Sequence, residues 1–219
     1  AMKHLTLTAV SLLLIGLTMS GTAYSQVPQI ERDALIALYN STGGANWTTN
    51  TGWLGDVGTE CNWYGVTCSS GSVSQIGLGN NSLSGSIPTE LGNLTNLTLL
   101  TLSHNSLSGS IPAELGNLTN LTSLDLSNNS LTGSIPAELG NLTKLKYLYL
   151  FNNSLSGSIP AELGNLANLE MLYLDNNSLT GPIPSELSNL QNLARLNLSE
   201  NSLTGPTPQW ILNRSWPYG

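Results

Sequence analysis

Charge is scarce in this chain. Only 9% of its 219 residues are charged, and six Lys or Arg stand against thirteen Asp or Glu, so the formal net charge is −7. A globular domain usually has about a quarter of its residues charged, so Ser, Thr and Asn must supply the solubility here. Since the six basic residues form no patch, the sequence excludes binding to a phosphate backbone, and we predict no nucleic-acid partner.

The sequence also lacks a long hydrophobic run, apart from one near its start. Lys3 is followed by an apolar stretch over residues 5–17, and Ala23-Tyr24-Ser25 places small residues at a cleavage site before Gln26. This pattern is typical of a signal peptide. The stretch is too short and too rich in Thr for a membrane span, although a retained anchor is the alternative. We expect residues 1–25 to be removed and the product to be a secreted or periplasmic monomer.

Cysteine and histidine are nearly absent. The two histidines, His4 and His104, lie in different segments, and the two cysteines, Cys61 and Cys68, stand close together. No zinc site can be assembled from this inventory, so we predict no metal and no cofactor. In an exported protein an isolated cysteine pair is typical of a disulfide rather than of a redox or metal site. We therefore expect a structural Cys61–Cys68 bond.

What the sequence has in abundance is repetition. Asparagine recurs every 24 residues, and between these asparagines the pattern Leu97-x-x-Leu100-x-Leu102-x-x-Asn105 returns with small changes. A fixed period with an L-x-x-L-x-L-x-x-N core is the signature of leucine-rich repeats. The predicted fold is an α/β leucine-rich-repeat solenoid of six units, with a parallel β-sheet on its concave face. The recurring asparagines are Asn81, Asn105, Asn129, Asn153, Asn177 and Asn201.

Each recurring position has a mechanical interpretation. The leucines are expected to point inward, and Asn105 to satisfy backbone groups where the chain leaves the strand. Gly109 permits a turn. Pro112 and Glu114 predict the first turn of a short helix, where a carboxylate is favoured by free N–H groups. This explains the ladder of glutamates, and the alternative of a cation site is set aside. Its members are Glu90, Glu114, Glu138, Glu162 and Glu186.

Residues 26–72 have a different composition and are expected to form an N-terminal cap. A helix is predicted over residues 28–39, with Ile30, Ala34, Leu35 and Leu38 on its inner face. The terminal repeat of a solenoid needs a lid over its leucine core. Three tryptophans and the cysteine pair suit such a lid, although a tryptophan-based ligand site is the alternative: Trp47, Trp53 and Trp63. The repeats are expected to occupy residues 73–216, and a short tail residues 217–219.

These motifs resemble a known family. The segment over residues 107–118, Leu-Ser-Gly-x-Ile-Pro-x-Glu-Leu-Gly-Asn-Leu, is similar to the plant-specific class of extracellular leucine-rich repeats found in receptor-kinase ectodomains and polygalacturonase-inhibiting proteins. The segment from Cys61 to Cys68 resembles their N-terminal cap, and residues 38–44 are more similar to exported bacterial and algal members. The resemblance implies a second sheet or bend on the Ser-Gly-x-Ile-Pro side and a ligand surface on the concave strands.

In a regular array, function is expected where the units differ. The outward positions of the fourth and fifth strands carry an aromatic cluster rimmed by charge, where the first three strands are small and mostly polar. Such a composition favours a recognition surface, and the alternative is that the aromatics cover the sheet as cross-strand neighbours. The predicted ligand-binding residues are Tyr147, Tyr149, Phe151, Met171, Tyr173 and Arg195, with Asp125 and Asp175 on the rim.

Catalysis has little support. Asp125 and Asp175 lie two strands apart, or about 9–10 Å, which overlaps the separation found in inverting glycosidases. An open sheet offers nothing to desolvate them, so we predict no enzyme and no catalytic residue. We expect a protein or peptide ligand, with a surface polysaccharide, including pectinase-inhibitor-like action, as the alternative. A further alternative is ice binding through the hydroxyl ladder of Ser82, Ser106, Ser130, Ser154, Ser178 and Ser202.

The signal-peptide interpretation predicts the N-terminus of the exported protein. Expressed in a cell with a secretion pathway, the chain should be recovered outside the cytoplasm beginning at Gln26, as intact mass will show. Replacing Ala23 by a bulky residue should block cleavage, because signal peptidase requires small side chains there. An exported product that still carries residues 1–25 would favour the membrane anchor.

Overall fold

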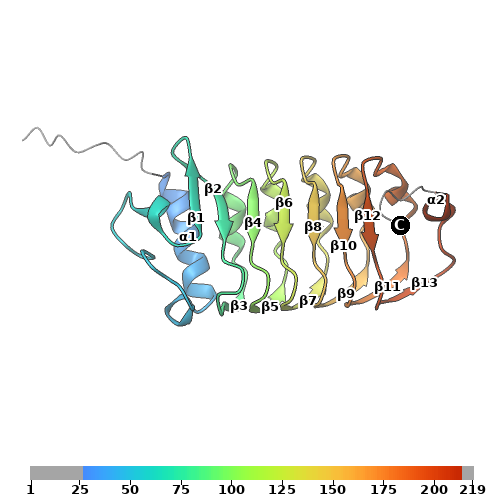
Figure 1. The fold of residues 1–219 in the computed structure, drawn as a ribbon, viewed down its shortest axis with the longest axis horizontal. Coiled ribbons are helices and arrows are strands. Elements are labelled where there is room, and N and C mark those ends of the chain that lie inside the picture. Colours follow the sequence, from blue (N-terminus) through green and yellow to red (C-terminus); the bar gives the residue numbers. More distant parts are fainter. Residues whose placement is uncertain (1–26, 214–219) are drawn as a thin grey trace, which may run out of the picture.

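The computed structural model describes residues 27–213 of the chain. Residues 1–26 and 214–219 lie outside this part. They include the predicted signal peptide, the last residues of the predicted repeats with Trp216, and the predicted tail with Tyr218. The described residues form an elongated stack in which two sheets run side by side along the long axis (Figure 1). Within this part, no helix is long and apolar enough to cross a membrane.

The first sheet, sheet A, has seven strands in the order β1-β2-β4-β6-β8-β10-β12. All neighbours are parallel except β1 and β2, which pair antiparallel and close the N-terminal edge. Strands of successive repeats are therefore adjacent, as the 24-residue period predicts. Their bounds are β1 Val66–Ser69, β2 Ser72–Gly77, β4 Leu99–Thr101, β6 Ser123–Asp125, β8 Tyr147–Tyr149, β10 Met171–Tyr173 and β12 Arg195–Asn197.

The second sheet, sheet B, has six parallel strands, which confirms the second sheet implied by the family resemblance. They are β3 Ser84–Ser86, β5 Ser106–Ser110, β7 Ser130–Ser134, β9 Ser154–Ser158, β11 Ser178–Pro182 and β13 Ser202–Thr204. The short helices predicted after each Ile-Pro pair are 3₁₀ helices with a glutamate in the first turn. They are η3 Thr89–Asn93, η4 Ala113–Asn117, η5 Ala137–Asn141, η6 Ala161–Asn165 and η7 Ser185–Asn189.

The leucine ladders form one continuous core between the two sheets and the 3₁₀ helices. In strands β4, β6, β8 and β10 the central leucine is buried, while its two neighbours are partly exposed on the other side. This alternation follows from the two-residue period of a strand. The first and third residues of these strands therefore face the solvent side of the sheet.

The recurring asparagines serve the backbone, as predicted. The Oδ1 atom of Asn105 accepts hydrogen bonds from the backbone N–H groups of Asn81 and Leu83, at 3.0 and 2.9 Å. Its Nδ2 atom donates to the carbonyl oxygens of Leu78 and Leu102, both at 2.9 Å. One amide thus joins two consecutive repeats at the point where the chain turns from sheet A toward sheet B.

Two glycines of the repeat have different roles. Gly109 adopts φ of +74°, a left-handed conformation that favours glycine and confirms the predicted turn. Gly116 is needed for close packing, because a Cβ atom there would lie 2.4 Å from the carbonyl oxygen of Glu138 in the next repeat. The Glu-Leu-Gly consensus therefore sets how closely neighbouring 3₁₀ helices approach.

The N-terminal cap consists of helix α1 (Gln29–Ser41), the short 3₁₀ helices η1 (Gly44–Asn46) and η2 (Glu60–Asn62), and strand β1. The predicted lid is confirmed in its packing. The three tryptophans are buried, and Trp53 contacts Trp47 and Trp63 with ring centroids 4.8 and 5.0 Å apart. The disulfide Cys61–Cys68 is present, with the two Cα atoms 5.4 Å apart.

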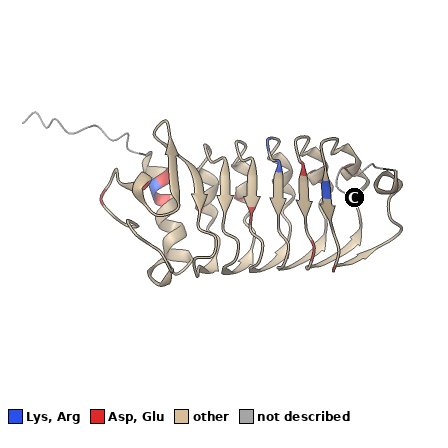
Figure 2. Ribbon diagram, in the orientation of Figure 1, with Lys and Arg blue, Asp and Glu red and all other residues tan. Residues whose placement is uncertain are grey.

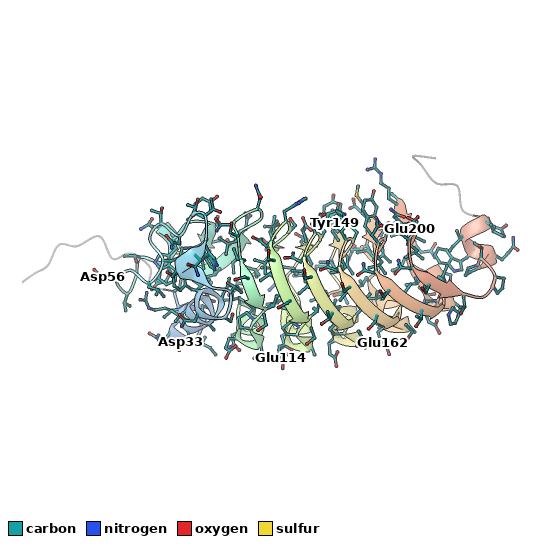
Figure 3. All side chains as sticks on the ribbon, turned by 90° about the horizontal axis from the view of Figure 1, so that it is seen from below. Asp33, Asp56, Glu114, Tyr149, Glu162 and Glu200 are labelled. Carbon is teal, nitrogen blue, oxygen red and sulfur yellow. A yellow bond between two sulfur atoms is a disulfide. The ribbon has the colours of Figure 1, made fainter. Side chains whose placement is uncertain are left out.

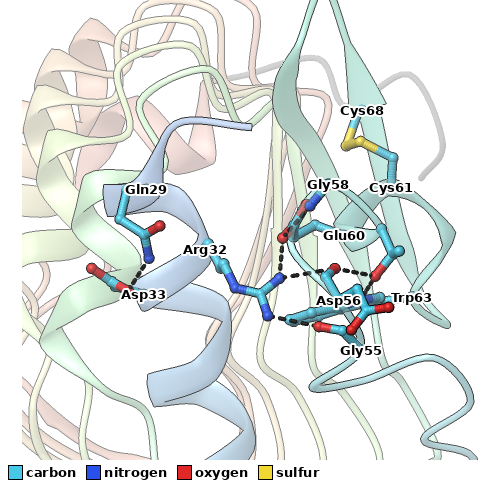
Figure 4. A network of polar contacts seen from close by, with 11 residues as sticks. Gln29, Arg32, Asp33, Gly55, Asp56, Gly58, Glu60, Cys61, Trp63 and Cys68 are labelled. Atoms are coloured by element: carbon cyan, nitrogen blue, oxygen red, sulfur yellow. Dashed lines mark hydrogen bonds and ion pairs between the residues drawn. A yellow bond between two sulfur atoms is a disulfide. The ribbon is translucent and has the colours of Figure 1, made fainter. Parts of the chain in front are cut away.

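The predicted inner face of the cap helix is wrong at its start. Ile30 is 55% exposed, whereas Glu31 and Arg32 are buried. Arg32 forms an ion pair with Glu60, donates to the carbonyl oxygen of Gly55 at 2.7 Å and lies over the ring of Trp63 (Figure 4). Glu31 accepts a hydrogen bond from the backbone N–H of Val73 at 2.7 Å. Fixed polar partners decide the rotation of this helix, and hydrophobic periodicity does not detect them.

At the other end, helix α2 (Gln209–Leu212) takes the place of a further 3₁₀ helix. Trp210 is partly buried and packs against the end of the leucine core. Within the described residues, this aromatic contact covers the C-terminal end of the core.

The asparagine ladder gives a stability prediction. Asn129→Ala should lower the free energy of unfolding by about 2–4 kcal/mol, because it leaves several buried backbone groups without partners. Asn129 accepts from the N–H of Leu107 and donates to the carbonyl oxygens of Leu102 and Leu126. Chemical denaturation will measure the change. The matched control is Asn141→Ala, an exposed position where we expect a change within about 0.5 kcal/mol; equal losses in both variants would contradict this role.

Candidate functional site

The solvent-facing positions of sheet A change character along the array. Strands β2, β4 and β6 present small or mostly polar side chains, whereas β8 and β10 present aromatic ones. Charge is sparse across this sheet (Figure 2). Tyr149 lies on the side of the solenoid opposite to Glu114 and Glu162 of the glutamate ladder (Figure 3). A ligand surface built on the variable residues is therefore separate from the repeated one.

Three rings of this surface pack together across two strands. The centroid of Tyr149 lies 5.4 Å from that of Tyr173 and 6.5 Å from that of Phe151, and the Phe151 and Tyr173 centroids are 6.3 Å apart. The strand register explains this, because Tyr149 and Tyr173 are direct partners in the parallel pair β8–β10. We call Tyr147, Tyr149, Phe151, Met171 and Tyr173 the aromatic cluster. The structure brings together all five members as the sequence predicted.

Further contacts hold the edges of the aromatic cluster. Tyr147 stacks nearly parallel to Tyr149, and its hydroxyl donates to the carboxylate of Glu170 at 3.3 Å. Glu170 forms an ion pair with Lys146 at 3.1 Å. The hydroxyl of Tyr149 points to the sulfur of Met171, 3.2 Å away. The rings are therefore ordered before a ligand arrives, which reduces the entropy lost on binding.

Lys146 and Glu170 were missed by the sequence reasoning. They stand just before their strands, where the preceding units have Thr98 and Thr122. Each of those threonines donates its hydroxyl hydrogen to a carbonyl oxygen of the unit before it. The signal that could have found the pair is this departure from threonine in two adjacent units.

The members of the aromatic cluster are half-buried rather than fully exposed. They cover one another, as the cross-strand interpretation expected, and still leave part of each ring on the surface. Burial has an electrostatic effect on the central residue. Desolvation raises the pKa of the Tyr149 hydroxyl above 10.0, and the nearby Tyr173, Tyr147 and Asp125 raise it further, while Arg195 opposes them.

The two aspartates predicted on the rim differ sharply. Asp125 is partly exposed, and its Oδ1 atom accepts hydrogen bonds from the N–H and the hydroxyl of Ser127, at 3.1 and 2.7 Å. Asp175 is only 9% exposed, so its placement on an open rim was wrong. Arg195, the first residue of β12, is exposed at the far side of the aromatic cluster. The pair of aspartates shares no hydrogen bond and no common partner.

Two other kinds of site, a metal site and a groove beside sheet B, have less support than the aromatic cluster. Among residues 27–213 there is no group of three or more His, Cys, Asp or Glu side chains placed to hold a metal ion. A groove does run along the Ile-Pro-x-Glu segments beside sheet B, but equivalent residues of successive units line it. Because that groove repeats the consensus, it offers less basis for selecting one ligand than the aromatic cluster does.

Comparison with known proteins places the chain in a family. It belongs to the leucine-rich repeat region family, whose model matches residues 77–209. A similar curated protein is a probable inactive receptor kinase of Arabidopsis thaliana, 39% identical over 93 residues, or 42% of this chain and 13% of that one. The chain thus spans a small part of this relative's length.

Two solved structures show the same likeness. The structure of PEPR1 with AtPEP1 has a TM-score of 0.78 at 34% identity and covers 84% of this chain and 26% of that one. The Arabidopsis receptor kinase HAESA, in complex with the peptide hormone IDA and the co-receptor SERK1, has a TM-score of 0.68 at 36% identity and covers 84% and 31%. The hypotheses of polysaccharide binding and of ice binding stay predictions.

The electrostatics of Tyr149 can be tested directly. In an NMR titration of ring-labelled tyrosines, Tyr149 should ionise above pH 10.0. The folded state holds the proton more tightly, so the contribution of this hydroxyl to folding stability is fully present below the ordinary pKa of tyrosine. That contribution is lost as pH rises through the raised pKa of the folded state. Asp125→Asn should lower the pKa of Tyr149, and Arg195→Gln should raise it. Shifts of opposite sign would show that another arrangement of charges surrounds the hydroxyl.

Proposed function

We propose that this chain is an exported, non-catalytic binding module that recognises a protein or peptide through the aromatic cluster on sheet A. The observation that carries the proposal is the concentration of five large side chains on one face of sheet A, four of them in the adjacent strands β8 and β10 and Phe151 just after β8, where most outward residues of β2, β4 and β6 are small or polar. The sheet itself does not require them, because β4 and β6 form the same ladder with Thr101 and Ser123 on that face.

The chemistry of the aromatic cluster suits a peptide. Tyrosine offers a flat apolar surface and a hydroxyl, so it can cover an apolar side chain and bond a backbone group at the same time. Ring-to-ring contacts and the bonds of Tyr147 and Tyr149 hold the cluster in place. Rigid aromatic anchors of this kind dominate the energetics of protein interfaces.

The relatives support the same class of ligand. HAESA is described in complex with a peptide hormone and a co-receptor. Those partners belong to that receptor, of which the chain covers less than a third, so they are a guide to ligand class only. The family also supports an extracellular place of action, which agrees with the signal peptide expected over residues 1–25.

A selection experiment tests the proposal. The purified exported chain should enrich binders from a displayed random-peptide library, and Tyr149→Ala/Tyr173→Ala should weaken those binders by about thirtyfold, because loss of an aromatic anchor at an interface costs about 2 kcal/mol. The matched control is Thr101→Ala/Ser123→Ala, which changes two residues on the same face of sheet A and should leave the binding unaltered. Peptides that bind the tyrosine variant as tightly as the original chain would refute the site.

A further inference from the structure

Asp175 has a buried carboxyl oxygen that accepts no hydrogen bond from any residue in 27–213. Its Oδ2 atom accepts a hydrogen bond from Nδ2 of Asn176 at 3.1 Å, while its Oδ1 atom is enclosed and has no partner within those residues. In the same part of the chain the other buried side-chain atom of this kind is Nε1 of Trp210, close in sequence to the undescribed end. A polar oxygen removed from water without a donor is costly, so it calls for an explanation.

The fold does not require a carboxylate at this position. The residues equivalent to Asp175 two and three repeats earlier are Ser127 and Ser103, which are 2% and 5% exposed. A small neutral hydroxyl therefore fills the same buried place elsewhere in the array. Asp125 shows that the sheet can satisfy an aspartate, since Ser127 donates to it twice. Asp175 has no such serine two residues later, because Asn177 stands there and its side chain bonds the backbone.

The neighbours of Asp175 are aromatic. It lies two residues after Tyr173, and its carbonyl oxygen accepts a hydrogen bond from the N–H of Asn152, the residue after Phe151. Tyr149 contacts both of these rings. The faces of aromatic rings attract cations, and Asp125 adds a second negative charge that acts on Tyr149. Arg195 opposes the effect of these negative charges on Tyr149.

We propose that the peptide bound by the aromatic cluster presents a lysine or arginine side chain, which donates a hydrogen bond to Oδ1 of Asp175 between the rings of Phe151 and Tyr173. This inference rests on the proposed function and specifies its ligand. A neutral donor would satisfy the oxygen but leave the carboxylate charge unpaired. The net charge of −7 also favours a basic partner during association.

Access to the oxygen requires a local motion. Oδ1 of Asp175 is enclosed, and the Asp175 side chain as a whole is only 9% exposed, so the side chain must rotate to meet a cation. Such a rotation changes side-chain torsion angles alone and needs no change in the strands.

The test uses labelled peptide pools, acetylated and amidated at their ends, in which one position is fixed as Arg, Lys, citrulline or norleucine. Binding to the exported chain is followed by fluorescence anisotropy. The Arg and Lys pools should bind at least tenfold more tightly than the citrulline and norleucine pools. Asp175→Ser should abolish this preference and leave binding of the neutral pools unchanged. Glu162→Gln is the matched control, because it removes one negative charge from an exposed position on the opposite side of the solenoid, and it should keep the preference.

The outcomes separate the two proposals. Binding that needs Tyr149 and Tyr173 but shows no preference for a cation, or keeps the preference in Asp175→Ser, overturns the inference and leaves the proposed function intact. Binding that ignores Tyr149→Ala/Tyr173→Ala overturns both. Thermal denaturation adds an independent measurement. Asp175→Ser should raise the melting temperature of the free protein, and a lowered one would show that the carboxylate serves the fold and contradict the inference.

Discussion

The amide of the recurring asparagine is the contact on which this architecture depends. Every 24 residues the chain must leave sheet A, and the backbone groups at that bend are partly buried. A single side chain accepts from the N–H groups of one repeat and donates to carbonyl oxygens of two. Without it each bend would bury unpaired polar groups. The leucine core drives the stacking, but the amide makes the bend compatible with that core.

Contacts between neighbouring units also explain why the repeats are so uniform. The inward leucines pack in one core, and Gly109 and Gly116 face Ser86 and Glu138 of the neighbouring units. A change at these positions therefore disturbs the packing between units, whereas the outward positions of sheet A contact mainly one another. Variation is tolerated there, and this is where β8 and β10 acquired their aromatic side chains. The contacts that hold the fold and the proposed contacts with a ligand thus lie on opposite sides of the same three-residue strands.

This division determines what the sequence can predict. The solenoid, the strand positions and the members of the aromatic cluster follow from period and alternation, because those features repeat or depart from a repeat, and the disulfide follows from the isolated cysteine pair. The buried ion pair of Arg32 and Glu60 does not, since it joins segments of the cap that occur once. The burial of Asp175 also escaped, because the sequence pattern placed this position outward, whereas Ser103 and Ser127 at the equivalent position are buried as well. Lys146 and Glu170 were visible as departures from threonine, yet their bond to Tyr147 required coordinates.

The aromatic cluster and Asp175 together illustrate how a repeat protein can accept local instability. In a two-sheet solenoid each unit gains most of its stability from its neighbours. The energetic cost of one unsatisfied carboxylate is therefore offset by several well-packed interfaces and does not unfold the chain. A compact domain with a single core has less freedom to carry such a defect. An unpaired buried charge can then persist until a ligand supplies its partner, and the free energy lost in the unbound protein is recovered in the complex. The array therefore supplies the excess stability from which a specific binding site can be made.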